Sequence, residues 1–566
     1  MDFVPMADVN QQERQMRCEP HPFTGAIYQE LEDGMVRVED KQAGKAGLFK
    51  WDGEYVEGDL TQADPHMLRY IGGPVMDESK DIFWNVLPPT PELANAMFKE
   101  NLARGGADKD KQQRPKIIAP YKADPGVKTE EGMRSSAYIP QQFFIENERK
   151  PDLLPEVYKK EAPYPGGPKQ VHVDRFTTKK FHDLEVEHLW KKSWQMACRE
   201  DDIPEVGDHV LYKIAHLEYI VTRSAEDEIK AFVNACPHRG RRICEHNGKR
   251  AEGFRCPFHG WSFGIDGKLH DLTCEWDFPK VRQEVGGLTE LKTARWGGFV
   301  FINPDDDAIS FEEYAGPDML AHYEKLRLED RFKMVHVAKV VKTNWKLMME
   351  AFLEAYHSVA THPQLLLSGG DLAETRYDVF GNWSRLGHAS APGSSVQRGI
   401  VVPKERTLET FRMVADMMGQ YLRGLIGDEV DEYSDHELVE QSFNNLFPNF
   451  HPWGGMARIV YRFRPNGDRH DECIADIMLL APWPKDKPKP PAAPMKMLDP
   501  DQHWVDAEEM GTLARILDQD SANVTQVYQG LRTKNPPRVI YSAYQESIIR
   551  AWHDKYEKLL GLEEGE

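Results

Sequence analysis

Three features are missing from the sequence: a long apolar run, an excess of positive charge and a nucleotide-binding motif. Without an apolar run of membrane-spanning length, we expect no transmembrane helix. The formal charge is −21, from 71 Lys and Arg against 92 Asp and Glu, which argues against nucleic acid or an anionic membrane as a partner. No G-x-G-x-x-G follows an expected strand, so the chain shows no motif for binding a nucleotide of its own.

Cysteine is sparse and scattered. There are seven cysteines, and two of them fall in the motif described below. The other five show no pairing pattern, which predicts free thiols rather than disulfides: Cys18, Cys198, Cys244, Cys274 and Cys473. The first residues, MDFVPMADVNQQERQ, have neither the basic start nor the apolar core of a signal peptide. We therefore expect a reducing, cytoplasmic location.

One dense motif is present at residues 236–261, which begins CPHRG and ends CPFHGW. A C-x-H and a C-x-x-H stand seventeen residues apart, and they supply four candidate ligands: Cys236, His238, Cys256 and His259. A [2Fe–2S] cluster of the Rieske kind takes two cysteines on one iron and two histidines on the other, so this set fits it. Gly240 and Gly260 follow the histidines, where a loop that passes close to a cluster has no room for a Cβ.

A structural zinc site and a chance coincidence are the alternatives to a cluster at this motif. Zinc also takes two cysteines and two histidines, although zinc spacing usually pairs C-x-x-C with H-x3–5-H and does not mix them in each half. Both halves begin Cys-Pro and carry a histidine and a glycine within the next three residues, and this repetition argues against chance.

The stretch resembles the cluster loops of Rieske proteins. In the respiratory-chain branch of that family each loop carries one more cysteine. Arg241 and Phe258 occupy those places here, so the motif resembles the lower-potential oxygenase or ferredoxin branch.

A second candidate metal site lies in NWKLMMEAFLEAYHSVATHP, within a helix that we expect over 343–361. Glu354 and His357 are three residues apart and would share a helical face. His362 lies five residues beyond His357, so both imidazoles reach one metal only if the helix ends or distorts, as Pro363 would require. Taken alone, this spacing fits core or exposed histidines more readily than metal ligands.

Two histidines and one carboxylate form the facial triad of non-haem Fe(II) oxygenases, and a Rieske cluster needs an electron acceptor. NWKxxxE followed by Glu-x-Tyr-His-x4-His also resembles the iron-binding helix of Rieske oxygenase α subunits, and the resemblance covers about residues 170 to 535. In a helix expected over 504–531, Asp520 falls on the apolar stripe, where an acid is costly unless it is paired or metal-bound. Asp518 shares the polar side with Arg515, so we choose Asp520, which also stands at the family's ligand place. A buried, hydrogen-bonded Asp520 without a metal is the alternative.

The resemblance gives Glu354 another role. In the family, an acid at this place, most often Asp, bridges a cluster histidine of one subunit to an iron-ligand histidine of its neighbour. Some members that act on methylated amines have Glu there. The alternative is an acid that only orients His357. The predicted Fe(II) ligands are thus His357, His362 and Asp520, with Glu354 as an inter-subunit electron-transfer bridge.

The resemblance implies an α+β fold, with an antiparallel β Rieske domain, a helix-grip (START-like) α+β catalytic domain and an N-terminal extension. Asp33-Gly34 and Asp52-Gly53 indicate the hairpins of a small β meander in the extension, and 103–135 is expected to be extended. The predicted domains are 1–165 (extension), 166–305 (Rieske domain with a preceding helix) and 306–566 (catalytic domain with mononuclear iron). Hydrophobic content of 40% and charged content of 29% are ordinary for a globular enzyme.

These features predict a terminal oxygenase component that relays electrons from the cluster to Fe(II) and uses O2 to hydroxylate an organic, most readily aromatic, substrate. A dioxygenase of aromatic hydrocarbon catabolism is the first expectation, and a Rieske monooxygenase or demethylase acting on a methylated amine or ether is the second. A Rieske electron carrier would leave the C-terminal half without a purpose. A binding protein with zinc in both sites is the remaining class.

Electrons would come ultimately from NAD(P)H, through a ferredoxin or flavin reductase partner. The resemblance implies a homotrimer, or an α3β3 assembly with a small β subunit, in which electrons pass between subunits. Five aromatic residues are candidates for a substrate pocket, although each is more readily core: Phe352, Phe443, Phe447, Phe450 and Trp453.

Overall fold

The structure is a computed structural model, and it describes most of the chain. The described residues are 18–72 (without 22, 23, 32, 33 and 52), 140–362, 375–387 and 404–563 (without 457 and 512). Asp33, Asp52, Pro363 and the segment 103–135, to which we assigned roles above, lie outside them. Two compact units emerge, one built on the N-terminal residues and one holding both candidate metal sites. Within the described ranges, no helix is long and apolar enough to cross a membrane.

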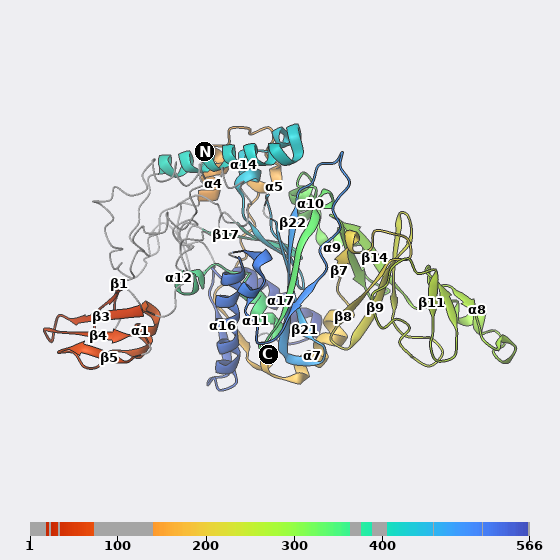
Figure 1. The fold of residues 1–566 in the computed structure, drawn as a ribbon, viewed down its shortest axis with the longest axis horizontal. Helices are drawn as coiled ribbons and strands as arrows, with labels where there is room; N and C mark the ends of the chain where they lie inside the picture. The colour runs from red at the N-terminus through yellow and green to blue at the C-terminus, as the bar shows by residue number, and fades with distance from the viewer. Residues whose placement is uncertain are drawn as a thin grey trace, which may run out of the picture. The chain divides into compact units, whose positions relative to one another are not determined.

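The N-terminal unit contains an antiparallel five-stranded meander (Figure 1). One face of the sheet is apolar because buried residues alternate along the strands, and a short helix packs on it. Val36, Val38 and Phe49 of the strands, with Leu68 and Ile71 of the helix, form this small core. Its elements are β1 (Cys18–Pro20), β2 (Ile27–Glu30), β3 (Met35–Asp40), β4 (Lys45–Lys50), β5 (Tyr55–Gly58) and α1 (Pro65–Gly72).

Two antiparallel sheets carry the cysteine and histidine motif. The six-stranded sheet has the order β7 (Gln195–Arg199), β15 (Phe299–Asn303), β14 (Glu290–Trp296), β10 (Glu228–Val233), β9 (Leu217–Ala225) and β8 (His209–Ile214). The three-stranded sheet consists of β11 (Gly253–Arg255), β12 (Ser262–Gly264) and β13 (Leu269–Asp271), followed by α8 (Val281–Val285). The β-branched and aromatic runs HVLYKI, EYIVTR and IKAFV lie in β8, β9 and β10.

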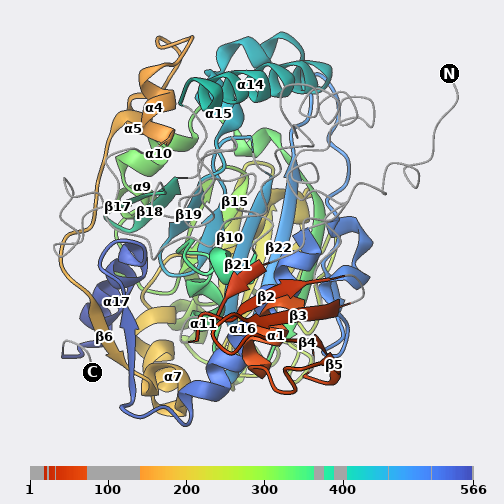
Figure 2. The same cartoon turned by 90° about the vertical axis from the view of Figure 1, so that its left-hand side faces the viewer.

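An eight-stranded sheet organises the second half of the chain (Figures 1 and 2). Its order is β17 (Arg376–Phe380), β18 (Trp383–Gly387), β19 (Phe443–Leu446), β20 (Phe450–Pro452), β21 (Ile459–Asn466), β22 (Arg469–Ala481), β16 (Phe332–Val341) and β23 (Lys496–Leu498). All neighbours are antiparallel except β23, which runs parallel to β16. Helices of this half include α9 (Phe311–Ala315), α10 (Pro317–Tyr323), α11 (Trp345–Glu350), α12 (Ser358–Thr361), α14 (Lys404–Ile426), α15 (Asp435–Val439), α16 (Leu513–Leu531) and α17 (Ser547–Leu560).

Strand β21 joins the two halves because its side chains alternate between the faces of the sheet. On one face Arg462 donates to the backbone carbonyls of Met196 and Ala197 in β7, at 2.9 Å each. Arg464 donates to the carbonyl of Lys213 in β8 at 3.1 Å. The buried carboxylate of Asp476 in β22 accepts from both guanidinium groups, at 3.0 to 3.2 Å, which keeps the two charges paired.

On the opposite face of the sheet, Tyr461 and Phe463 of β21 contact the ring of Phe352, which follows α11. Helix α11 packs on β21 and β22, and α16 packs on α11. The second candidate metal site therefore lies on the face away from the six-stranded sheet.

Residues 169–185, which the sequence assigned to the Rieske domain, pack against the catalytic region. β6 (Lys169–His172) pairs with β24 (Arg538–Tyr541) near the C-terminus, and α6 (Asp174–Thr177) and α7 (Lys179–Glu185) contact β22. The predicted domain limits stay predictions, but these contacts tie the residues around 170–185 to the C-terminal half.

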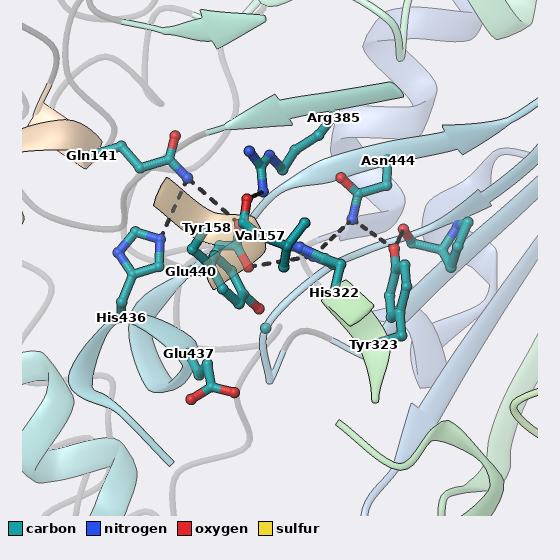
Figure 3. A network of polar contacts seen from close by, with 12 residues as sticks. Gln141, Val157, Tyr158, His322, Tyr323, Arg385, His436, Glu437, Glu440 and Asn444 are labelled. Atoms are coloured by element: carbon teal, nitrogen blue, oxygen red, sulfur yellow. Dashed lines mark hydrogen bonds and ion pairs between the residues drawn. The ribbon is translucent and has the colours of Figure 1, made fainter. Parts of the chain in front are cut away.

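The stretch that holds α4 (Pro140–Glu146) and α5 (Glu156–Lys159) also lies on this half. Figure 3 shows Gln141 and Tyr158 reaching into a buried polar network beside His436 and Glu440. The amide of Gln141 lies 3.5 Å from His436 Nε2 and from Glu440 Oε1. Burial raises the pKa of Glu440 to about 7, because the nearby charge of Arg385 offsets only part of the desolvation.

Two predicted helices are shorter or broken, and a third helical stretch is divided. Residues 311–323 form α9 and α10, which are separated by Gly316 at φ +81, with Pro317 starting the second helix. The helix expected over 504–531 begins only at Leu513, after two single turns and Gly511 at φ +58. The helix expected over 343–361 consists of α11 and the single turn of α12, so Glu354 lies between helices and does not share a helical face with His357.

Candidate metal centres

Both cysteine loops close in the same way. The N–H of Cys236 donates to the carbonyl of Arg241 at 2.8 Å, and the carbonyl of Cys236 accepts from the N–H of Gly240 at 2.8 Å. In the second loop Cys256 makes the equivalent bonds with Trp261, at 2.8 Å, and Gly260, at 3.1 Å. Both glycines have positive φ, +74 and +79, which favours glycine at these positions. The first loop follows β10 and the second joins β11 to β12, so the two turns hold the four candidate ligands.

The four residues lie together at the end of this region. The rings of His238 and His259 have centroids 4.6 Å apart, and both cysteines are buried in a common apolar cluster. Trp261 stacks on His238 at 4.9 Å and belongs to that cluster, so it both packs the core and covers one ligand. Burial raises the pKa of the Cys236 thiol. Burial lowers the pKa of His238, and the charge of Arg239 lowers it further.

The residues present fit the predicted cluster. Among the described residues, none accepts or donates a hydrogen bond at the buried Nδ1 of His238. Two buried thiols beside two histidines, one with an unmatched ring nitrogen, form the ligand set that a Rieske [2Fe–2S] cluster needs.

The second site gathers the three predicted iron ligands. His357 and His362 lie at the two ends of α12, and Asp520 projects from α16. The ligand atoms of all three are within 4.8 Å of one another. His362 Nε2 is 2.7 Å and His357 Nε2 is 3.5 Å from Asp520 Oδ1. A single helical turn separates the histidines, and their ring centroids are 5.1 Å apart. The spacing of five residues suits a shared metal because the helix ends at His362.

Two acceptors orient the histidines. His357 Nδ1 donates to Glu354 Oε1 at 2.6 Å, and the backbone N–H of His357 donates to Glu354 Oε2 at 2.9 Å. His362 Nδ1 donates to the amide oxygen of Gln519 at 2.6 Å. With both Nδ1 atoms engaged as donors, both Nε2 atoms face Asp520, so that loss of the Nε2 protons would leave two lone pairs for a metal beside the carboxylate, the arrangement typical of metal-binding histidines. Glu354 thus fills the orienting role here, and its role as a bridge to another subunit stays a prediction.

The charges at this site favour a cation. Burial alone would lower the pKa of His357, but Glu354 and Asp520 outweigh it and raise that pKa to about 10. Burial would raise the pKa of Asp520, but His362 and His357 lower it to about 2. In the described part of the chain, the buried Oδ2 of Asp520 has no hydrogen-bond partner. Two imidazoles and a carboxylate with an unused oxygen fit a mononuclear Fe(II).

Sequence reasoning missed Gln519, although it stands beside the predicted ligand Asp520 in the motif QDSANVTQ. It also assigned no structural role to the NWKxxxE residues, which anchor α11. Trp345 donates to the buried Glu185 at 2.8 Å, and Lys346 pairs with the same carboxylate. Of the five pocket candidates, all are buried except Phe443, which is half-buried.

Two family models match the chain. Residues 193–282 match the Rieske [2Fe-2S] domain, and residues 317–562 match the ring hydroxylating alpha subunit (catalytic domain). Together the matches cover more than half of the chain and include every predicted metal ligand. The chain belongs to the Rieske non-haem iron oxygenase α-subunit family. The family and the cofactors predicted from the sequence, a Rieske [2Fe–2S] cluster and a mononuclear iron, are thereby confirmed, whereas the residue-level assignments rest on the geometry above.

Curated relatives of this chain differ in the substrates that their names give. It is 29% identical over 247 residues to the salicylate 5-hydroxylase large oxygenase component of a Ralstonia species, covering 41% of this chain and 56% of that protein. It is 28% identical to the carnitine monooxygenase oxygenase subunit of Escherichia coli, covering 41% and 60%. It is also 28% identical to the biphenyl dioxygenase subunit alpha of Paraburkholderia xenovorans, covering 51% and 69%. The first two matches thus span little more than half of the relatives' length.

Solved structures share the fold. A naphthalene 1,2-dioxygenase variant bound to phenanthrene aligns with a TM-score of 0.51 at 20% identity, over 70% of this chain and 93% of that one. A quaternary ammonium Rieske monooxygenase in complex with L-carnitine aligns with a TM-score of 0.50 at 16% identity, over 72% and 99%. The mixed α and β architecture is therefore that of Rieske oxygenases, while the helix-grip description of the catalytic region stays a prediction.

Proposed function

We propose that this chain is the terminal oxygenase component that relays electrons from a Rieske cluster to a mononuclear Fe(II) and hydroxylates an aromatic substrate with O2. The observation that carries the proposal is the convergence of His357, His362 and Asp520, with both histidine Nε2 atoms turned to one carboxylate. Three ligands on one side of a metal leave positions open for O2 and substrate.

The residues of the chain divide the work. Cys236, His238, Cys256 and His259 would hold the cluster, which supplies single electrons. When bound at the second site, Fe(II) supplies the binding and reduction of O2. Glu354 and Gln519 keep the Nδ1 protons of the two ligand histidines, which fixes the ring orientation and leaves Nε2 available.

A second candidate function is a Rieske monooxygenase or demethylase that acts on a methylated amine or ether. Glu354 in place of the more usual Asp, and the similarity to carnitine monooxygenase subunits, favour it. Both functions need electrons from a ferredoxin or flavin reductase partner and, we propose, a homotrimer or α3β3 assembly in which Glu354 bridges neighbouring subunits.

Substrate-dependent O2 uptake with a reductase, across a panel of aromatic compounds and methylated amines, tests the proposal. The His357→Ala variant should keep the visible Rieske spectrum and lose turnover, because only the second site is changed. The exposed His503→Ala variant is the control and should keep both. Turnover that survives His357→Ala would refute the proposal, and product mass spectra would separate dihydroxylation from monohydroxylation or demethylation.

A further inference from the structure

Three buried polar side chains stand out on the face of the large sheet that carries Tyr461. Their exposures are 2% for His451, 4% for Asn445 and 7% for Trp453. Among the described residues, none forms a hydrogen bond with either ring nitrogen of His451, with Asn445 Oδ1 or with Trp453 Nε1. Native structures pair more than nine in ten buried polar atoms, so four unmatched atoms on neighbouring strands indicate a missing partner.

Strand register places these residues side by side. His451 in β20 pairs directly with Tyr461 in β21. Leu446 pairs with Phe450 across the β19–β20 hairpin, so Asn445 and His451, one residue further on each strand, point to the same face. Trp453 continues from β20 and contacts the ring of Tyr461 at 6.0 Å.

This face leads to the iron site. The ring of Phe463 contacts His451 at 5.3 Å and Phe352 at 5.1 Å, and Phe352 also contacts Tyr461 at 4.7 Å. Phe352 lies five residues before the iron ligand His357. Burial raises the pKa of Tyr461, and the charge of Asp520 raises it further, so this phenol lies within electrostatic reach of the third ligand.

The unmatched atoms define the chemistry of the partner. An indole Nε1–H only donates and an amide oxygen only accepts. Burial lowers the pKa of His451 to about 3, so its imidazole is neutral and offers one donor and one acceptor. The three side chains carry no charge at neutral pH, and they stand beside the aromatic rings of Phe352, Tyr461 and Phe463. A partner that satisfies all four atoms must therefore both donate and accept hydrogen bonds and need carry no charge, and the neighbouring rings favour an aromatic body.

We propose that His451, Asn445 and Trp453 recognise the polar substituent of an aromatic substrate, a hydroxyl or carboxamide rather than a bare hydrocarbon ring or a full charge. This proposal rests on the proposed function, which makes the site the substrate site of an oxygenase. It narrows the substrate class to aromatic compounds with such a substituent. A site built to hydrogen-bond a hydroxyl rejects the analogue that lacks it, because its own polar groups are then left unpaired.

Binding by the holoenzyme of naphthalene and 2-naphthol, measured by equilibrium dialysis, tests this inference without any need for turnover. The native protein should bind 2-naphthol at least about tenfold more tightly than naphthalene. His451→Phe should abolish that preference by weakening only the naphthol, and Asn445→Leu should reduce it. His451→Gln, which keeps a donor and an acceptor, should retain most of it.

His322→Phe is the matched control, because His322 is also buried with an unmatched Nδ1 among the described residues but belongs to the network of Figure 3 on the other face. It should leave the preference unchanged. Equal binding of both ligands by the native protein, or the same loss of preference in His322→Phe, would overturn the inference and leave ordered water as the partner of these atoms. If no compound is turned over while the preference is observed, the proposed function fails and the recognition site stands.

Discussion

The cluster site and the iron site are assembled in different ways within one chain. Each candidate cluster loop closes on its own cysteine through two backbone hydrogen bonds, and all four predicted ligands lie within residues 236–261. The iron site takes its histidines from the ends of one helical turn and its carboxylate from α16, 158 residues after His362. The first site is thus defined by local turns, whereas the second exists only when α12 and α16 pack together.

The sites also differ in what surrounds their ligands. Cys236 and Cys256 are themselves core residues of the cluster region, together with Phe232, Phe254 and Trp261. At the iron site His357 is one-quarter exposed, and the histidines are held by polar neighbours. We therefore expect the loss of the cluster to affect the fold and the loss of the iron to affect mainly the chemistry.

The largest effect should follow from Cys256→Ser. The variant removes a cluster ligand from the core of its region, and bound metal contributes directly to folding free energy. We expect loss of the visible Rieske spectrum and of turnover, and a fall of several kcal/mol in the free energy of unfolding of this region, measured by hydrogen exchange. The solvent-exposed Cys274→Ser is the control. A stable, colourless protein with native exchange rates would show that the cluster is not needed for the fold.

Asp520→Asn should separate the two sites. An amide keeps the shape but loses the charge that draws a cation to His357 and His362. We expect turnover to fall by at least about a thousandfold and one iron per chain to be lost, with the Rieske spectrum unchanged. Iron analysis beside the visible spectrum measures both centres. Asp518→Asn is the matched control. Asp518 lies on the other side of α16 and accepts the backbone N–H of Trp504, away from the two histidines. Full activity in Asp520→Asn would show that Asp520 is not the third ligand.

A smaller loss is expected from the residues that orient the iron ligands. Glu354→Gln and Gln519→Leu remove or weaken the acceptors of the two Nδ1 protons. Outer residues of this kind typically change metal affinity by about 10- to 100-fold. Iron titration of the protein stripped of its mononuclear iron should therefore show weaker binding in both variants, with unchanged thermal unfolding. If only Glu354→Gln slows turnover while its iron content is normal, the acid has the further bridging role.

The smallest effect distinguishes the two cluster loops. Both glycines have positive φ, but a Cβ at Gly260 would lie 3.0 Å from Thr273 Oγ1, whereas a Cβ at Gly240 would meet no protein atom within 4 Å, contrary to the lack of room expected there from the sequence. Gly240→Ala should cost about 1 kcal/mol from backbone strain alone. Gly260→Ala should cost more, because Thr273 must also move. Denaturant unfolding of the two variants measures the difference, and equal costs would mean that the second loop yields as easily as the first.

The sequence allowed the cluster ligands to be predicted because their spacing reflects two local turns. The sequence also pointed to the three candidate iron ligands that the structure brings together, but partly for an incorrect reason. Glu354 and His357 were expected on one helical face, whereas the helix stops after α11 and Glu354 accepts the N–H of His357 in a turn. Asp520 could be selected from the sequence because its place on the apolar stripe depends only on the spacing of residues along α16.

Some features could not be predicted because they depend on partners far away in sequence. Gln519 carries no pattern of its own, and only the approach of His362 gives it a function. The buried pair of Lys346 and Glu185 joins residues 161 positions apart. Likewise, the polar atoms of His451, Asn445 and Trp453 become informative only when strand pairing shows that they share a face.

The two-sided use of β21 makes this strand intolerant of length changes. Inserting one residue between Arg462 and Phe463 would turn Phe463 toward the cluster region and leave Arg464 pointing at the aromatic face. A single inserted residue would thus remove the contact of Arg464 with Lys213 and leave a guanidinium group on the aromatic face of the sheet. Over evolutionary time, variation in this strand should take the form of substitutions, while gains and losses of residues accumulate in the turns at its ends.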